Sequence, residues 1–263
     1  MGLNWIDSNQ LSFNTLLLLE RVQLSWFPGW VPEAKMAITL RANPHIEWYL
    51  RHKCPELNPW VDQLLSANPP TFSPSAEQIR AAEIAVMNTI NDLMVYVVDP
   101  KLYDARPFMA WDENELLMLT EFSGKIVIDV GSGTGKLALI AASKAQVVFA
   151  VEPVSNLRRY IKDKARAHNI SNIFTVDGLI TDIPFPDGFT DITMGGHVFG
   201  ETPELEYAEL KRVTRPGGMV ILCPGTSMNE TQAHEFLLEE GFAWSVFEEP
   251  QDGPMRKYWK VLP

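Results

Sequence analysis

Short apolar runs alternate with amphipathic helical patterns from about residue 124 to the end of the chain. Apolar runs without polar alternation are typical of strands that are buried on both faces of a parallel sheet. Strands are predicted at 126–130, 147–151, 173–176, 190–194, 219–222, 243–247 and 257–261. Helices are predicted between them at 137–143, 156–168, 204–213 and 230–240. The alternation predicts an α/β fold with a doubly wound, mostly parallel sheet of seven strands, which binds ligands at the carboxyl ends of its strands.

The first 99 residues have a different pattern, with apolar positions at helical spacing and frequent prolines. Eight prolines within the first 74 residues divide this segment into short pieces. Asn43-Pro44 is a helix start signal, because proline is favoured at the first helical position. Ser75 and Gln78 form a capping box, and apolar residues then continue at helical spacing as far as Val97. This second pattern predicts one long helix at the end of the segment.

Five of the eight tryptophans also lie in this first segment, at positions 5, 26, 30, 48 and 60. Side chains of this size either fill a core or line a pocket, and core filling is the more common role. We therefore predict a helical N-terminal cap at 1–99, a linker with a first helix at 100–123, and an α/β domain at 124–263. The cap is expected to bound the pocket for a substrate.

Composition and charge exclude several classes of function. The chain has 263 residues, of which 46% are hydrophobic and 21% charged, and a formal net charge of −11. An acidic protein repels phosphate backbones and anionic lipids, and no run of about 20 apolar residues is present, so neither nucleic acid nor membrane is expected as a partner. Two cysteines are too few for a disulfide framework, and His45, His52 and Cys54 match no common metal-ligand spacing. No metal is therefore expected, and the cytoplasm is the expected location.

The most informative segment is 129–136, which reads Asp-Val-Gly-Ser-Gly-Thr-Gly-Lys where the first predicted strand must turn into a helix. A phosphate-binding P-loop is excluded, because it needs glycine where Val130 stands and Ser or Thr where Leu137 stands. A dinucleotide site is disfavoured but stays open, since Lys136 occupies the place of its third glycine. A site for S-adenosylmethionine suits Asp129, because a carboxylate attracts an ammonium or sulfonium group. An ordinary strand-to-helix turn is the remaining alternative.

Residues 129–135 resemble the first motif of the class I S-adenosylmethionine-dependent methyltransferases, and in particular the type 11-like enzymes that act on small molecules. Further segments resemble motifs of this family in the same order, at 147–153, 177–179, 183–191 and 210–218. Each stands at a predicted strand end, and the resemblance covers about residues 103–263. It implies a Rossmann-like sheet and S-adenosylmethionine as the cofactor.

The resemblance also implies which residues bind this cofactor. Glu152 would accept the ribose hydroxyls, Asp177 would accept the adenine amino group, and Leu179 would pack on the adenine ring. Each charge-assisted hydrogen bond of this kind contributes about 1.5–3 kcal/mol. A solvated loop acid at 152 and a turn residue at 177 are the alternatives. The implied cofactor-binding set is Asp129, Gly131, Ser132, Gly133, Gly135, Glu152, Pro153, Asp177, Gly178, Leu179 and Gly195.

Candidate substrate residues flank these motifs. His197 follows the fourth predicted strand, where members of the family usually meet their substrate, and a histidine can take up a proton near neutral pH. His197 is therefore a candidate catalytic base, while a substrate contact and a structural role stay open. Glu201 could orient His197 or could act at a helix N-terminus. Tyr103 and Arg106 lie in a segment that resembles the linker that closes over cofactor and substrate in many members, and they are candidate substrate-binding residues.

The expected function is methyl transfer from S-adenosylmethionine to a small-molecule acceptor, through an oxygen, nitrogen or carbon nucleophile, by in-line displacement. Segment 194–201 lacks the Asn/Asp-Pro-Pro-aromatic signature of enzymes that methylate amino groups of nucleic acid bases or of protein glutamine. A basic stripe with interleaved aromatic residues would indicate RNA binding, and the sequence contains no such stripe. A nicotinamide-dependent oxidoreductase on a similar sheet and a non-catalytic, methyltransferase-like interaction module remain the alternatives.

Overall fold

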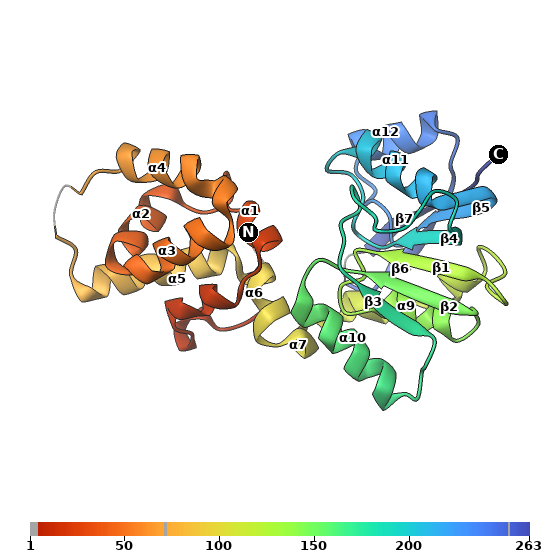
Figure 1. Ribbon diagram of the computed structural model, residues 1–263, viewed down its shortest axis with the longest axis horizontal. Helices are drawn as coiled ribbons and strands as arrows, with labels where there is room; N and C mark the ends of the chain where they lie inside the picture. The colour runs from red at the N-terminus through yellow and green to blue at the C-terminus, as the bar shows by residue number, and fades with distance from the viewer. Residues whose placement is uncertain (1–4, 71–72, 252) are drawn as a thin grey trace. The chain divides into compact units, whose positions relative to one another are not determined.

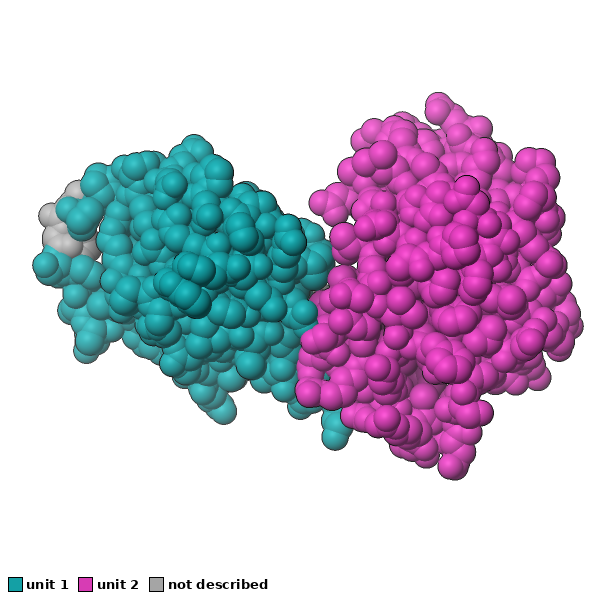
Figure 2. Space-filling model, in the orientation of Figure 1, with its two compact units in different colours: residues 1–103 teal, residues 104–263 magenta. Residues whose placement is uncertain are grey.

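The computed structural model describes residues 5–70, 73–251 and 253–263 (Figure 1). The chain divides into two compact units, Met1–Tyr103 and Asp104–Pro263, which we call unit 1 and unit 2 (Figure 2). Unit 1 is helical throughout its described residues, and unit 2 holds the sheet. The boundary between the units lies four residues after the predicted end of the helical cap at residue 99.

The helices of unit 1 are mostly short, and several begin at a proline. The 3-10 helices are η1 (Ser8–Gln10), η2 (Phe13–Leu18) and η3 (Pro55–Leu57). The α-helices are α1 (Arg21–Ser25), α2 (Glu33–Ala42), α3 (Pro44–Lys53), α4 (Asn58–Ala67), α5 (Ala76–Thr89), α6 (Asn91–Val98) and α7 (Pro100–Asp104). The predicted start of α3 at Pro44 is confirmed. Asn43 does not cap this helix through its side chain, because its amide donates to the carbonyl of Thr39 at 3.0 Å.

The predicted long helix after residue 75 is wrong in one respect, because it consists of two helices, α5 and α6, bent by 83° where they meet. The capping box is confirmed, since the Gln78 N–H donates to Ser75 Oγ and the Ser75 N–H donates to Gln78 Oε1. The first residue of α6, Asn91, accounts for the break. Its buried side chain accepts from the backbone N–H groups of Trp5 and Ile6 and so ties α6 to the start of the chain. The apolar spacing continues through the break, so periodicity does not reveal it.

Among the described residues, no single helix is long and apolar enough to cross a membrane. The bent pair α5 and α6 reaches that length and composition only when the two helices are taken together.

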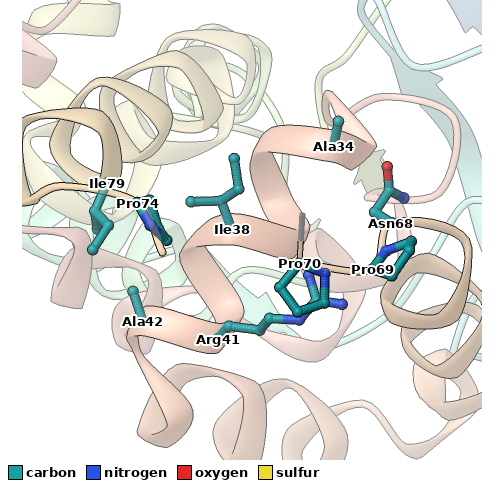
Figure 3. A pocket seen from close by; sticks show the side chains of 9 residues that line it. All are labelled: Ala34, Ile38, Arg41, Ala42, Asn68, Pro69, Pro70, Pro74 and Ile79. Carbon is teal, nitrogen blue, oxygen red and sulfur yellow. The ribbon is translucent and has the colours of Figure 1, made fainter. Parts of the chain in front are cut away.

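Unit 1 contains a pocket of about 370 Å³ beside α2 (Figure 3). Ile38 of α2 and Ile79 of α5 contribute to its mostly apolar lining, together with Pro69 and Pro74. The guanidinium of Arg41 also lines the pocket and donates to the carbonyl of Leu65 at 2.7 Å. The helical unit therefore has a cavity of its own.

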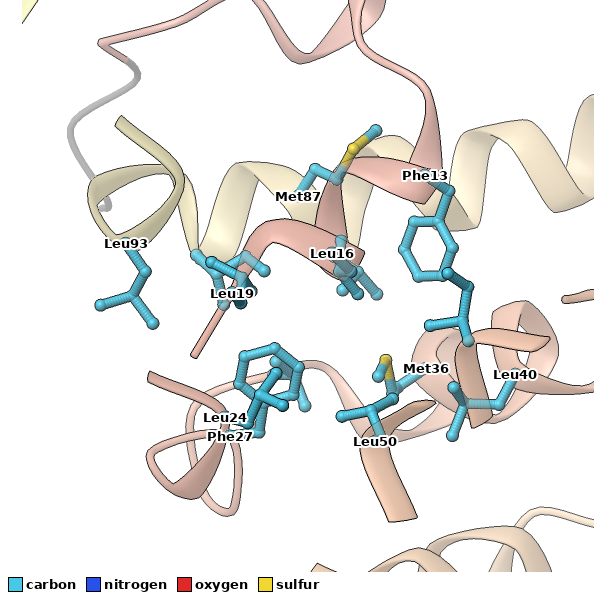
Figure 4. Packing of buried hydrophobic residues seen from close by; sticks show 14 of the residues in the cluster. Phe13, Leu16, Leu19, Leu24, Phe27, Met36, Leu40, Leu50, Met87 and Leu93 are labelled. Atoms are coloured by element: carbon cyan, nitrogen blue, oxygen red, sulfur yellow. The ribbon is translucent and has the colours of Figure 1, made fainter. Parts of the chain in front are cut away.

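The core of unit 1 is built mainly from aliphatic side chains (Figure 4). Leu16, Leu19 and Leu24 are fully buried, with Phe27 beside them. The prediction that the tryptophans of this segment fill the core is wrong for three of them, because they are exposed at the surface. The exposed fractions are 37% for Trp26, 47% for Trp30 and 60% for Trp48.

The described residues of unit 2 form one seven-stranded sheet in the order β3-β2-β1-β4-β5-β7-β6. The strands are β1 (Ile126–Val130), β2 (Val147–Val151), β3 (Ile173–Val176), β4 (Thr190–Gly195), β5 (Thr214–Leu222), β6 (Ala243–Glu249) and β7 (Gly253–Val261). All neighbours pair in parallel, except that β7 runs antiparallel to both β5 and β6. The doubly wound, mostly parallel, Rossmann-like sheet that the sequence predicts is confirmed.

Helices cover both faces of this sheet (Figure 1). The helical elements of unit 2 are η4 (Pro107–Ala110), α8 (Asn114–Leu117), α9 (Lys136–Ala142), α10 (Ser155–Ala167), α11 (Pro203–Val213) and α12 (Gln232–Glu239). Neighbouring residues of β1 point to opposite faces: Val127 packs with α9, and Ile128 packs in the core of α11 and α12. Each face thus has its own hydrophobic core, as expected for strands buried on both sides.

The fifth strand begins earlier than predicted. It was predicted at 219–222, but β5 already begins at Thr214. The register between β4 and β5 shifts between Thr190, which pairs with Thr214, and Ile192, which pairs with Met219. The extra residues form a bulge within the strand.

Candidate active site

The five parallel strands, β1 to β5, all end at the same edge of the sheet. Strand β6 also ends there, because it is antiparallel to β7, which is itself antiparallel to β5. The glycine-rich loop leaves β1 at this edge and leads into α9. Gly131 has φ +63°, and a Cβ at this position would lie 2.3 Å from Cγ2 of Val198. The same valine side chain lies against Gly195 at the end of β4. Glycine is therefore needed at 131 for the segment after β4 to pack on the loop.

Glu152, immediately after β2, is hydrogen-bonded to the glycine-rich loop. Its Oε2 accepts from the N–H of Gly133 at 2.8 Å, and its Oε1 accepts from the N–H of Val154 at 2.9 Å. Burial raises the pKa of Glu152 to about 7, against the two backbone hydrogen bonds, which lower it. A Cβ at Gly133 would meet no atom closer than 4.0 Å, so the loop is open at this residue. An acidic acceptor therefore stands beside an accessible stretch of backbone.

Asp129 does not lie where the sequence reasoning expects it. We predicted that its carboxylate faces a cationic ligand, but the side chain is buried under the loop, and its Oδ2 accepts from the N–H of Ala138 in α9 at 3.0 Å. Ser132 is likewise turned inward, because its hydroxyl donates to the carbonyl of Asp129 at 2.7 Å. Burial raises the pKa of Asp129 to about 7. Both side chains hold the loop to the start of the helix.

Arg158 of α10 bridges the residues that follow β2 and β3. Its Nη1 donates to the carbonyl of Glu152 at 2.6 Å and to Oδ1 of Asp177 at 3.0 Å. The side chain of Asp177 is 71% exposed. A second acidic acceptor therefore lies near the Glu152 backbone and is open to a ligand. Pro153 lies between Glu152 and Val154 and is half-buried.

Gly178 and Leu179 follow Asp177 as the resemblance implies. A Cβ at Gly178 would lie 2.6 Å from Cδ of Pro184, so the turn is closely packed on the following segment. The side chain of Leu179 is 40% exposed, while its backbone bonds in both directions with Asp182. An exposed leucine held by its backbone at a strand end suits the face of an aromatic ring.

Both lysines near the loop already have partners. Lys136 Nζ donates to the carbonyls of Met109 and Trp111 and lies 3.8 Å from the centre of the Trp111 ring. Partial burial lowers the pKa of Lys136 to about 8. Lys164 pairs with Asp104 at 2.6 Å and donates to the carbonyl of Thr134 in the loop at 3.0 Å. The carboxylate of Glu152 at the Gly133 amide makes the loop a poor match for a pyrophosphate, because two negative groups repel each other.

The residues present therefore fit a nucleoside that carries no phosphate. Asp177 offers an exposed acceptor for hydroxyl or amino groups, and Leu179 offers an apolar surface. Glu152 is a buried acid whose two oxygens also accept from the N–H groups of Gly133 and Val154. Gly135, with φ +86°, is the N-cap residue that precedes α9, and it packs against Ile161 of α10.

His197 lies two residues after β4, and its Nε2 is 2.9 Å from Oε1 of Glu249 at the end of β6. Of the two roles left open for Glu201, orientation of His197 is not observed, because the carboxylate that contacts the imidazole is that of Glu249. His197 has φ +54°, a conformation that costs a residue with a side chain about 1–2 kcal/mol. Its N–H donates to the carbonyl of Pro224 at 3.0 Å, and the ring of Phe108 meets the imidazole edge-on.

The two predicted substrate residues upstream belong to different units. Tyr103 belongs to unit 1, where its ring packs edge-on against Trp5 and Tyr96. Arg106 belongs to unit 2 and precedes η4, with its carbonyl accepting from the N–H of Met109 at 2.9 Å. The proposed contacts of Tyr103 and Arg106 with a substrate stay predictions.

Three further histidines have partners outside this edge. His234 of α12 is buried, and its Nδ1 lies 2.9 Å from the hydroxyl of Tyr258. His45 and His52 bond to Asn14 Oδ1 and to the carbonyl of Trp48. Within the described ranges, no group of three or more His, Cys, Asp or Glu side chains could hold a metal ion.

Sequence reasoning missed three residues of this edge: Arg158, Val198 and Glu249. Arg158 stands one turn into the helix after β2, which is a common position for a side chain that reaches back to strand ends. Glu249 is an acid at the end of a strand, the same signal that points to Glu152. That signal becomes usable only once β6 is known to run parallel to β2.

Comparison with known proteins identifies the kind of domain that unit 2 contains. Residues 128–222 match the family model of the methyltransferase domain. A demethylmenaquinone methyltransferase of Geobacillus kaustophilus is 28% identical over 127 residues, which are 46% of this chain and 54% of that protein. A malonyl-[acyl-carrier protein] O-methyltransferase of Serratia marcescens is 30% identical over 146 residues, which are 54% of this chain and 52% of that protein. The matches span about half the length of these two relatives.

A solved structure of an S-adenosylmethionine-dependent methyltransferase from Aquifex aeolicus aligns with 63% of this chain and 99% of that chain, with a TM-score of 0.49 and 20% identity. The range of the family model begins within β1, ends with β5 and includes the glycine-rich loop. Unit 2 therefore contains a methyltransferase domain of the S-adenosylmethionine-dependent class.

Proposed function

We propose that this protein transfers a methyl group from S-adenosylmethionine to a small-molecule acceptor at the carboxyl edge of unit 2. One observation carries the proposal: the buried carboxylate of Glu152 lies 2.8 Å from the amide of Gly133, with Asp177 tied to the same strand end. Glu152 would hold the ribose hydroxyls, Asp177 would accept from the adenine amino group, and Leu179 would cover one face of the adenine ring.

When bound, S-adenosylmethionine supplies a methyl group on a positively charged sulfur. The protein has to align the acceptor with that methyl group, and alignment of this kind can lower a barrier by about 7–11 kcal/mol. We assign His197 as the general base for an acceptor that must lose a proton, and Tyr103 and Arg106 as acceptor contacts. The helical unit 1 would bound the acceptor pocket, as its composition suggests.

The names of two relatives indicate a class of acceptor. One is named for demethylmenaquinone and one for malonyl-[acyl-carrier protein]. Both names favour a metabolite or a carried acyl group over a nucleic acid, in agreement with the net charge of −11. The two cysteines, Cys54 and Cys223, are free and buried, which suits the reducing cytoplasm that we propose as its location.

Calorimetric titration of the full chain with S-adenosylhomocysteine and, separately, with NADH tests the cofactor site. We expect S-adenosylhomocysteine to bind and NADH not to bind. Glu152→Ala should weaken binding at least tenfold, which corresponds to about 1.4 kcal/mol. Glu152→Gln keeps the size and one carbonyl oxygen, so it separates loss of charge from loss of loop support. Glu204→Ala, at an exposed acid of α11, is the matched control.

Binding of NADH in place of S-adenosylhomocysteine would favour the oxidoreductase alternative. Transfer of labelled methyl groups from S-adenosylmethionine to a small-molecule fraction of a cell extract then tests the activity. Binding without any methyl transfer would favour the non-catalytic module.

A further inference from the structure

The acid at the end of β6 stands at the same edge as the glycine-rich loop. Strand β6 is antiparallel to β7, and β7 is antiparallel to β5, so β6 runs in the direction of β1, β2 and β4. Glu249 is its last residue. The 2.9 Å contact joins it to His197, which is 52 positions away in the chain. The sheet topology therefore delivers a carboxylate to the segment after β4.

Glu249 is buried to an extent that requires a compensating partner. It is 2% exposed, and its side chain has no exposed surface. Oε1 contacts His197, while Oε2 has no hydrogen-bond partner in the part of the chain that the structure describes. Burying a carboxylate with an unmet acceptor is unfavourable unless a positive charge can form beside it. The imidazole of His197 is the group that can carry this charge.

His197 is held in one orientation from three sides. Its backbone adopts φ +54°, its N–H donates to Pro224, and its ring meets Phe108 edge-on. The side chain is nevertheless 38% exposed, in contrast to Glu249. A strained backbone, a buried acid and an accessible ring together are typical of a site that performs chemistry.

The other charged groups around the pair are few. Lys136 at the start of α9 and Cys223 after β5 interact electrostatically with Glu249. Lys257 of β7 is paired with Glu115 of α8 at 2.6 Å. Lys136 is held at the carbonyls of Met109 and Trp111, as described above. His197 thus stands as the hydrogen-bonded partner of Glu249 within the described residues.

We propose that Glu249 is a positioning residue that holds the Nε2 proton of His197, so that Nδ1 takes the proton of a hydroxyl group on the acceptor. This inference rests on the proposed function and deepens it by naming a hydroxyl-bearing small molecule as the acceptor class. With Nε2–H donating to the carboxylate, the neutral ring keeps its lone pair on Nδ1. The carboxylate then stabilises the imidazolium that forms, as the acid of a catalytic triad does.

The methyl transfer forms one bond to carbon and breaks another. A lone pair of the acceptor oxygen forms the new bond to the methyl carbon. The bond between that carbon and sulfur breaks, and its electron pair remains on sulfur. The proton of the hydroxyl moves to Nδ1 of His197, and the charge of the ring is balanced by Glu249. An amine acceptor has a free lone pair and does not need this base during attack.

The first test uses NMR of the full chain labelled with [15N]histidine. The chain has five histidines, and His197→Gln identifies the signal of His197. We expect the neutral ring to carry its proton on Nε2. Glu249→Ala removes the acceptor of that proton and should increase the share of the ring with its proton on Nδ1. Glu248→Ala, at the exposed neighbouring acid, should leave the position of the proton unchanged. A neutral ring with its proton on Nδ1 would overturn the proposal.

The second test uses S-adenosylmethionine with a labelled methyl group and a small-molecule fraction of a cell extract. We expect O-methylated products, and at least a tenfold lower rate for Glu249→Gln with the affinity for S-adenosylhomocysteine unchanged within twofold. Glu249→Asp keeps the charge and should retain part of the rate, which a loss of packing does not explain.

The failures of the two proposals are distinguishable. Absence of S-adenosylhomocysteine binding, or binding without any methyl transfer, contradicts the proposed function and this inference with it. Methyl transfer only to nitrogen or carbon, or equal rates for wild type, His197→Gln and Glu249→Gln, overturns the base assignment alone.

Discussion

At the scale of single residues, two buried acids make this edge sensitive to pH. Burial raises the pKa of Asp129 and of Glu152 to about 7 each. The folded protein therefore keeps these protons to a higher pH than the unfolded chain does. Between about pH 4 and pH 7 the folded state binds more protons, so the free energy of unfolding falls as the pH rises through this window.

Asp129→Asn isolates the part of this pH dependence of the free energy of unfolding that comes from Asp129. Asparagine stays neutral and its side-chain oxygen can still accept from the N–H of Ala138. The variant should be more stable than wild type at pH 8 by about 1–3 kcal/mol and should show little gain at pH 4. Urea denaturation at both pH values measures this difference. Asp163→Asn, at an exposed acid of α10, should change stability equally at both pH values, and a similar pH response in that control would refute the assignment to burial.

At the scale of elements, the glycine-rich loop and the segment after β4 form one packed unit through Val198. Gly131→Ala would introduce both an unfavourable φ, worth about 1–2 kcal/mol, and a clash with Val198, worth about 1–3 kcal/mol. Gly133→Ala has a similar φ but open space, so it should show only the first cost. Thermal denaturation of Gly131→Ala and of Gly133→Ala measures the loss of stability that each substitution causes.

The double variant Gly131→Ala/Val198→Ala tests the clash directly. Removal of the two methyl groups of Val198 should relieve part of the cost, with a coupling energy of about 1–2 kcal/mol between the two positions. Additive effects in the double-mutant cycle would show that the loop and the segment after β4 do not constrain each other.

The start of α5 offers a second prediction at this scale. Ser75→Ala removes the side chain that accepts from the Gln78 N–H, so it should destabilise unit 1 by about 0.5–2 kcal/mol. Hydrogen exchange at the first amides of α5 measures the loss locally. Ser66→Ala, at an exposed serine near the end of α4, is the control and should leave that exchange unchanged.

At the scale of the whole molecule, local patterns predict the sheet well and long-range partners poorly. Strands such as β1 and β2 are continuous apolar runs, because both of their faces are buried, and their bounds are predicted without error. The contact of His197 with Glu249 depends on the direction of β6 and on a partner 52 positions away. No local pattern contains that information. The same limit explains the inward turn of Asp129, which is decided by the position of α9.

Unit 1 shows the other limit of sequence reasoning. The spacing of apolar residues identifies helices there, but not the break before Asn91, which depends on hydrogen bonds to residues about 85 positions earlier in the chain. The exposure of Trp30 and Trp48 is equally invisible to composition, because a tryptophan can lie at a surface as well as in a core.

The division into two units leads to a prediction about folding and binding. The buried residues of the unit 1 core all lie before residue 104, and those of the two cores on the sheet of unit 2 all lie after it. The cofactor-binding residues proposed here also lie within unit 2. A fragment of residues 104–263 should therefore fold alone and bind S-adenosylhomocysteine within about threefold of the full chain, a difference of about 0.7 kcal/mol.

Circular dichroism and calorimetry of that fragment measure the two properties. Glu152→Ala within the fragment should weaken binding as it does in the full chain, since the loop and its supporting acid are both present. Acceptor turnover should instead depend on unit 1, if that unit bounds the acceptor pocket. A fragment that folds but binds S-adenosylhomocysteine more than tenfold more weakly would place part of the cofactor site in unit 1. In that case Tyr103, the last residue of unit 1, would be the first position to test by substitution with phenylalanine.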